Sequence, residues 1–358
     1  MAAVITVVVS VLIFGLVVMV HELGHFICAK KAGIKINEFS IGMGPALFKT
    51  VRGGIQYSVR ALPIGGYVSM EGEDEEIDPE QAQQSEAEQA LQQDAPGVPF
   101  PMAKVWKRII VVAAGAVMNL VLGFMVLLLM FTFGDAGASK TVAYVEDGSP
   151  VQQAGLQVDD EIVAINGRRC FVVNDILYEL QRTQDQTADL TVKRNGQTMQ
   201  LEDVHFALVQ NGDSQTMNIG FKVYSLEKNV KNVLEQAADY TIFYARLVFR
   251  SLIDLVTGHV SVNELSGPVG IISAIGQAAS MGVSEVLFML VLLTVNLGIF
   301  KLLPFPALDG GKMVFLILEG IFRRPIPKKF EIFVNAAGMI ALFGLMLFAT
   351  FNDITRLF

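Results

Sequence analysis

The sequence predicts a polytopic α-helical membrane protein with four transmembrane helices, a small cytoplasmic-side β-element and an inserted β-rich domain. Three observations favour this fold class. Hydrophobic residues make up 52% of the 358 residues and charged residues only 17%, against about 25% in ordinary soluble proteins. Four apolar runs approach the thickness of a bilayer. Between the second and third runs, short apolar segments alternate with turn dipeptides, which is typical of a β-rich domain.

The four apolar runs differ in length. A bilayer core of about 30 Å needs about 20 helical residues. The second and fourth runs meet this length, the first does so only if it continues beyond His21, and the third is short and enters a proline-containing stretch. Irregular backbone at membrane depth is tolerated only where protein buries it or it lines a wet cavity, so this stretch hints at an intramembrane site. We assign the helices to residues 1–30, 109–134, 284–311 with the loop included, and 331–353.

The distribution of lysine and arginine predicts the orientation. Basic residues follow the first run, precede the second and lie between the third and fourth. Such loops are usually cytoplasmic, which places both termini and residues 135–280 outside. The first run has no basic segment before it and no Ala-x-Ala cleavage site, so we expect it to be retained rather than removed as a signal peptide.

The loop after the first helix has two parts. Residues 36–70 contain short apolar runs around glycines and predict a membrane-associated β-region. Residues 71–101 form an acidic, glutamine-rich insert that we interpret as a flexible, solvated linker. Ten of the 35 acidic residues lie at 71–94, and the remaining acids nearly balance the 27 basic ones. No basic stripe indicates nucleic-acid binding, and two cysteines cannot form a disulfide framework.

Residues 138–224 have the pattern of a compact β-rich domain. Asn166-Gly167 and Asn195-Gly196 are hairpin turn signals, and the stretch 149–168, SPVQQAGLQVDDEIVAINGR, resembles part of a PDZ domain. In bacterial PDZ domains the strand order is permuted, which would make Ile219-Gly220-Phe221 the turn that offers backbone N–H groups to a peptide C-terminus. The alternative is a spacer or size filter with an empty groove. Residues 227–280 then show the three-and-four spacing of amphipathic helices.

The chemistry is concentrated in His21-Glu22-Leu23-Gly24-His25. Residues four apart lie on one face of a helix, so the two histidines can present imidazole nitrogens to one metal ion. Glu22 would lie beside that ion as a proton acceptor, as in the H-E-x-x-H zinc motif. Lone histidines at a membrane boundary are often only polar edge residues. However, two of the four histidines fall in this motif, and ionisable groups in an apolar helix are rare without a function.

A catalytic zinc needs a third protein ligand and one open position. Asp254, Asp309 and Asp353 are the downstream carboxylates near membrane depth. By the predicted topology only Asp309 reaches the same side as His21. Prolines before it break the helix, and glycines after it allow a sharp turn. Asp309 could also be an N-cap for a helix starting near Lys312, a role that does not exclude ligation.

Taken together, HELGH in the first run, LPFPALDGG after the third, the PDZ-like insert and the four spans resemble the site-2 protease family of intramembrane zinc metalloproteases, in particular its regulator of sigma-E protease group with a single PDZ domain. Further similar stretches are residues 39–45, 62–68 and 111–119. The resemblance covers nearly the whole chain apart from the acidic insert.

The resemblance implies roles for several residues. His21, His25 and Asp309 would bind Zn²⁺ and Glu22 would be the general base. The β-region would offer a strand edge to unwound substrate, with Gly65 and Gly66 shaping it, and Asn296 matches a recurrent asparagine of the third span. There are departures, because Lys301 stands where the family usually has an asparagine thought to contact substrate, Lys312 replaces a frequent histidine or arginine, and Ala116 replaces a common proline. Lys301 could snorkel to the cytoplasmic face or alter substrate handling.

The predicted function is therefore intramembrane zinc proteolysis. Substrates would be single-span membrane proteins, of the anti-sigma factor or remnant signal peptide type, whose helix unwinds inside the bilayer. The protein would reside in the bacterial inner membrane, with its active site toward the cytoplasm and the PDZ domain outside. Two alternatives are a PDZ-bearing membrane scaffold and a metal transporter. A scaffold would not need Glu22, and a transporter would need polar residues across the second and fourth spans, which offer almost none.

Overall fold

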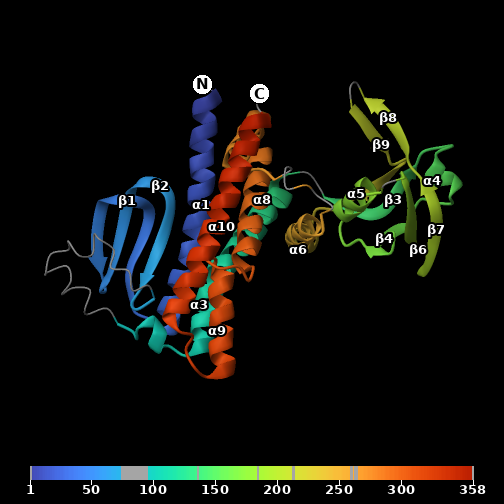
Figure 1. Cartoon of the computed structure of the whole chain (residues 1–358). Coiled ribbons are helices and arrows are strands. Elements are labelled where there is room, and N and C mark those ends of the chain that lie inside the picture. The colour runs from blue at the N-terminus through green and yellow to red at the C-terminus, as the bar shows by residue number, and fades with distance from the viewer. Residues whose placement is uncertain are drawn as a thin grey trace. The chain divides into compact units, whose positions relative to one another are not determined.

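The computed structural model describes residues 2–73, 96–134, 137–183, 185–211, 214–258, 261 and 265–356 (Figure 1). The chain divides into two compact units. The first comprises residues 1–126 together with 248–358, and the second comprises residues 127–247. Residues 74–95 of the predicted acidic insert lie outside the described part of the chain.

Four helices among the described residues are long and apolar enough to cross a membrane, which confirms the predicted number of spans. The first helix continues well past His21, as its length required, so the HELGH motif lies inside a helix. Backbone groups in such helices are satisfied internally, as the bilayer demands. The four are α1 (Ala2–Ala32), α3 (Val105–Phe133), α8 (Val283–Leu302) and α10 (Lys328–Arg356).

The third span ends at Leu302 because the chain then meets Pro304 and Pro306, which have no N–H to donate. An irregular connection follows, and α9 (Asp309–Phe322) begins directly at the predicted ligand. The N-cap residue of α9 is Leu308, whose side chain makes no capping hydrogen bond. The alternative interpretation of Asp309 as an N-cap is therefore wrong, and its carboxylate belongs to the first turn of the helix.

A shorter apolar helix, α7 (Pro268–Met281), packs against α1, α8 and α10. Its first turn is held by the far end of α10. The N–H groups of Gly267 and Gly270 donate to the two carboxylate oxygens of Asp353, at 3.1 and 2.7 Å. Asp353 thus satisfies free amides at a helix N-terminus, and this carboxylate is occupied away from the histidines.

The β-element predicted after α1 is a small antiparallel sheet. Its two strands are long and irregular, so each supplies two pairing segments. Residues 36–41 pair with 66–70 on one side and with 56–59 on the other, and residues 46–52 pair with 55–60. Segment 66–70 is therefore one edge of the sheet. The strands are β1 (Ile36–Arg52) and β2 (Ile55–Met70), and a 3-10 turn, η2 (Phe100–Met102), leads into α3.

A buried polar network crosses this sheet. Glu38, 1% exposed, accepts hydrogen bonds from Ser58 at 2.5 Å, Tyr67 at 2.8 Å and Arg60 at 3.1 Å. Burial alone would raise the pKa of Glu38, but these hydrogen bonds and the Arg60 charge hold its pKa below the usual value. Because Tyr67 belongs to the edge segment, the network fixes that edge to the strand beside it.

The second unit contains an antiparallel sheet with strand order β10-β3-β4-β6-β7, in which β5 also pairs with β4. Buried and half-buried side chains alternate along β6, as expected for a strand with one face on a core. The last strand pairs with the first, and β10 is left at an edge. The elements are β3 (Ala138–Val145), α4 (Pro150–Gln153), β4 (Glu161–Ile165), β5 (Arg168–Arg169), α5 (Val173–Gln181), β6 (Thr187–Arg194), β7 (Gln197–His205), β8 (Ala207–Asn211), β9 (Ser214–Asn218) and β10 (Phe221–Ser225).

Helix α6 (Val230–Val256) leads from the second unit back to the first. Ala237, Phe243 and Tyr244 are buried, whereas Val230 and Ile253 are among its exposed apolar residues. The predicted amphipathic region is thus two helices, α6 and the more apolar α7.

Candidate metal centre

Helix α1 places His21 and His25 on one face, one turn apart, as their spacing predicts. Their Nε2 atoms lie 3.2 Å apart, and the rings are nearly perpendicular. His21 is 2% exposed. Two imidazole nitrogens therefore converge on one point within the membrane-spanning part of the chain.

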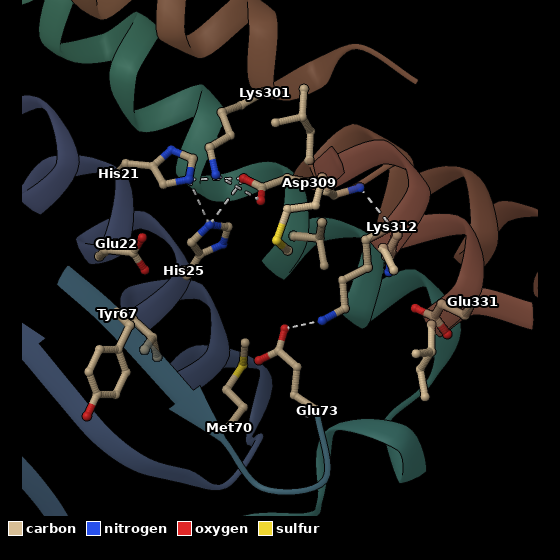
Figure 2. Close-up of a pocket in the computed structure, with 18 of the residues that line it drawn as sticks. His21, Glu22, His25, Tyr67, Met70, Glu73, Lys301, Asp309, Lys312 and Glu331 are labelled. Atoms are coloured by element: carbon tan, nitrogen blue, oxygen red, sulfur yellow. Dashed lines mark hydrogen bonds and ion pairs between the residues drawn. The ribbon is translucent and has the colours of Figure 1, made fainter. Parts of the chain in front are cut away.

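Asp309 meets these histidines although it is far away in the sequence. Its Oδ2 atom lies 3.0 Å from Nε2 of His21 and 3.5 Å from Nε2 of His25. Each of the three residues offers one ligand atom, and these atoms lie within 4.8 Å of one another. Figure 2 shows the three side chains pointing toward a common centre. The structure thus brings together all three predicted metal ligands.

The donor set fits a zinc ion. In a tetrahedral site with bonds of about 2.0–2.1 Å, neighbouring ligand atoms are roughly 3.3 Å apart, close to the distances observed here. Nδ1 of His25 lies 2.8 Å from the carbonyl oxygen of Val111. A carbonyl only accepts, so Nδ1 carries the hydrogen and Nε2 directs a lone pair at the centre. Oδ2 of Asp309 is buried and receives no hydrogen bond from a described residue. A divalent cation would satisfy these lone pairs together.

Helix α3 approaches the site at a glycine. A Cβ atom on Gly115 would lie 2.3 Å from Nε2 of His25 and 2.7 Å from Cε1 of His21. One turn earlier, the backbone of α3 accepts the His25 hydrogen bond at Val111. The sequence interpretation included Gly115 in a similar stretch but assigned it no role. The sequence signal for its role is its size, because small residues in membrane helices mark places where helices pack closely.

The connection from α8 to α9 is held in shape by α10. Ala307 has a left-handed φ of 67°, which is unfavourable for a residue with a Cβ, and its N–H donates to Oδ1 of Asn335 at 3.1 Å. A Cβ on Gly338 would lie 2.5 Å from Pro306, so α10 packs closely on the loop. Asn335 was missed by the sequence interpretation, although it is a lone polar side chain among apolar ones.

Lys301, one of the three departures noted in the sequence, also reaches the site. It lies in the last turn of α8, and its Nζ is 3.5 Å from Oδ1 of Asp309. The ammonium group therefore points inward to the predicted ligand. Glu22 follows His21 in α1, and Figure 2 shows its carboxylate beside the two histidine side chains.

A cleft of about 900 Å³ opens onto these residues. The edge segment 66–70 lines one side of it through Tyr67, Val68 and Met70, and a face of α10 lines another (Figure 2). A Cβ on Gly66 would lie 3.6 Å from Cγ of Glu22 and 2.8 Å from the carbonyl oxygen of Ser40. The sheet edge consequently passes directly beside Glu22.

The other predicted site residues are less closely associated with the centre. Gly65 has a φ of 91° and lies against the Met43 side chain. Asn296 is exposed on α8 and is not among the described residues that line the cleft. Ile219, Gly220 and Phe221 belong to the second unit, at the start of β10.

Comparison with known proteins gives consistent results. The model of peptidase family M50 matches residues 9–345. The chain is 35% identical to "Putative zinc metalloprotease CPE1693" of Clostridium perfringens, covering 96% of this chain and 97% of the relative. It is 30% identical to "Regulator of sigma-W protease RasP" of Bacillus subtilis and 32% identical to "Zinc metalloprotease RasP" of Bacillus licheniformis, each covering 99% of both chains.

Proposed function

Because this chain belongs to peptidase family M50, the site-2 protease family, and is a membrane-embedded zinc metalloprotease, we propose that it hydrolyses peptide bonds within transmembrane segments of single-span proteins. The observation that carries this proposal is the meeting of His21, His25 and Asp309 beside Glu22, at one end of a cleft among membrane helices. Anti-sigma factors and remnant signal peptides are the substrate classes proposed.

The three ligand residues would hold the ion and leave one coordination position for water or substrate. Zinc in such a site supplies a Lewis acid that polarises a carbonyl group and makes water more acidic. Glu22 takes the proton of the attacking water on its carboxylate and delivers it to the leaving amine. His25 is held in the correct tautomer by Val111.

A transmembrane helix hides its peptide bonds in internal hydrogen bonds, so the substrate must unwind before cleavage. Among the described strands, segment 66–70 pairs only with β1, and three of its residues line the cleft. An extended substrate could add to this edge as a further strand, which would satisfy its exposed backbone groups and place a peptide bond beside Glu22.

We also propose that the second unit is a PDZ domain that screens substrates. Its edge strand β10 follows Gly220, whose φ is 67°, and a peptide could pair with that edge. The N–H of Gly220 already donates to Oδ1 of Asn218 at 3.1 Å, and Glu146 contacts the same asparagine. An incoming carboxylate would have to displace Asn218 near this acid. Screening by bulk is consequently the alternative to peptide binding.

The proposed location is the bacterial inner membrane, with the metal centre toward the cytoplasm and the second unit outside. The lysine and arginine bias of the loops supports this orientation.

The test of proteolysis is Glu22→Gln in the purified full chain loaded with zinc. We expect bound zinc, measured by elemental analysis, to be unchanged and cleavage of a model transmembrane peptide to fall by at least about 100-fold, because the proton acceptor is lost. Glu285→Gln, at an exposed position in the first turn of α8, is the matched control and should cleave normally.

Retained cleavage by Glu22→Gln would refute Glu22 as the base. If the wild-type protein instead carried zinc across liposome membranes without cleaving peptide, the transporter alternative would replace the proposal. Peptides ending in a free carboxylate or an amide, titrated onto the full chain, separate a binding groove from a size filter.

A further inference from the structure

The two oxygens of the Asp309 carboxylate face different partners. Oδ2 lies 3.0 and 3.5 Å from the imidazole nitrogens of His21 and His25. Oδ1 lies 3.5 Å from Nζ of Lys301. Figure 2 shows the ammonium group and the two rings converging on the carboxylate. The carboxylate is thus divided between a metal-facing atom and an ammonium-facing atom.

Lys301 is placed for this contact by the end of a membrane helix. It lies one residue before the end of α8, ahead of the connection that carries Asp309. An ammonium at this depth is unfavourable unless it pairs with an anion or reaches water. Lys301 is 28% exposed and Asp309 19%, so the pair is only partly open to the cleft.

The other cations that line the cleft have different surroundings. Nζ of Lys312 lies 2.6 Å from Glu73 and 5.2 Å from the centre of the Phe100 ring. Lys328 belongs to α10, which lines another side of the cleft. Among the described pairs, Lys301 is the cation that contacts a predicted metal ligand.

A carboxylate can bind zinc through one oxygen or through both. Two-oxygen binding would occupy part of the coordination sphere that a hydrolytic site must leave open. A cation on one oxygen keeps that oxygen away from the metal and orients the other toward it, as outer partners of metal ligands commonly do.

We propose that Lys301 is a positioning residue that holds Oδ1 of Asp309, so that the carboxylate presents Oδ2 alone to the metal. The inference rests on the proposed function, since it requires Asp309 to be a ligand. Its rival is an ion pair that only stabilises the connection between α8 and α9. The two differ in what they predict for the geometry of the bound metal.

The test uses the purified full chain with Co²⁺ in place of zinc, because the visible absorption of Co²⁺ weakens as its coordination number rises. In Lys301→Met the freed Oδ1 should join the metal, so the absorption should weaken. With zinc, kcat should fall on the order of tenfold while KM stays within about twofold. Lys301→Arg retains a cation and should keep most of the wild-type absorption and kcat.

Lys231→Met is the matched control, because this lysine is 80% exposed on α6, and it should leave both readouts unchanged. Thermal unfolding confirms that the variants are folded. If Lys301→Met does not fold, Lys301→Leu takes its place with the same expectation, since leucine has neither a charge nor a hydrogen-bond donor. An unchanged Co²⁺ spectrum and an unchanged kcat in a folded neutral variant would overturn the proposal.

His21→Ala separates failure of this inference from failure of the proposed function. It should abolish stoichiometric Co²⁺ binding. If His21→Ala bound Co²⁺ as the wild type does, the metal centre itself would be misassigned and both proposals would fall. If His21→Ala lost the metal while Lys301→Met behaved as the wild type, only the role of Lys301 would be wrong.

Discussion

Nδ1 of His25 and the carbonyl oxygen of Val111 lie 2.8 Å apart, and this hydrogen bond joins the metal-binding face of α1 to α3. Four residues further along α3, Gly115 leaves space for both rings, because a Cβ there would lie 2.3 Å from Nε2 of His25 and 2.7 Å from Cε1 of His21. The second span is therefore part of the metal centre, although it supplies no ligand. Val111 orients the imidazole of His25, and Gly115 leaves space for the imidazoles of both His21 and His25.

Gly115→Ala should weaken zinc binding. Its Cβ would lie 2.3 Å from Nε2 of His25, so either the helices separate or the imidazole turns away from the centre. We expect at least a tenfold loss of affinity, about the effect of disturbing a metal ligand's support, in a chelator competition assay. Gly344→Ala, where no atom lies within 4 Å of the added carbon, is the control. Equal affinities for both variants would contradict the packing described.

Gly66→Ala should separate metal binding from substrate cleavage. The added carbon would lie 2.8 Å from the carbonyl oxygen of Ser40 and 3.6 Å from Cγ of Glu22, which pushes the sheet edge out of register with the base. We expect zinc content to be unchanged and kcat/KM on a transmembrane peptide to fall on the order of tenfold. Normal cleavage by this variant would mean that the edge does not position substrate.

Asn335→Leu should disturb the metal centre from α10. The N–H of Ala307, which is partly buried, would lose its acceptor, and the unfavourable φ of Ala307 would lose its support. Chelator competition should show weaker zinc binding. Asn335→Asp keeps an acceptor oxygen and should bind zinc more tightly than the leucine variant. The reverse order would show that Asn335 does not act through the loop.

Glu38 should make the small sheet sensitive to acid. Its pKa is lowered in the folded protein, because hydrogen bonds from Ser58, Tyr67 and Arg60 outweigh burial. A group with a depressed pKa contributes stability that is complete above its unfolded value, here about 4.5, and that is lost as the pH falls through the folded value. The protection factors of the amides of residues 36–41, which correct hydrogen exchange for its intrinsic pH dependence, should therefore fall below about pH 4.5.

In Glu38→Gln this acid dependence should flatten, and exchange near neutral pH should already be faster because a buried charge pair is broken. Glu235→Gln removes an exposed carboxylate, 59% accessible and paired with Lys231, and should change little. An identical acid profile in wild type and Glu38→Gln would exclude this carboxylate as the cause.

The sequence predicts the helices and the ligands well because each depends on local pattern. Long charge-free runs must become helices in lipid, and a four-residue spacing places His21 and His25 together whatever surrounds them. Asp309 could be predicted as the third metal ligand because it lies between prolines and glycines that mark the end of a membrane helix. Pro304 and Pro306 do end α8, as expected.

The features that the sequence did not predict depend on contacts between segments that are far apart along the chain. Asn335 acts on a residue 28 positions away, and Gly115 matters only because α3 lies against α1. Lys301 had two open interpretations, and neither was contact with Asp309. The order of segments that leaves 66–70 at the sheet edge arises from double pairing by β1, which alternating hydrophobicity does not encode.

Among the described contacts of α10, those made by Asn335, Gly338 and Asp353 connect it to other segments of the first unit. Asn335 and Gly338 contact the loop before Asp309, and Asp353 accepts hydrogen bonds from the start of α7. Asp353 lies eighteen positions after Asn335, which corresponds to about 27 Å along the helix. A straight helix hardly changes its length. A movement of α10 along its axis would therefore displace the loop before Asp309 and the start of α7 together. Because α7 and the loop before Asp309 are both attached to α10, a displacement of the start of α7 would be transmitted along α10 to that loop.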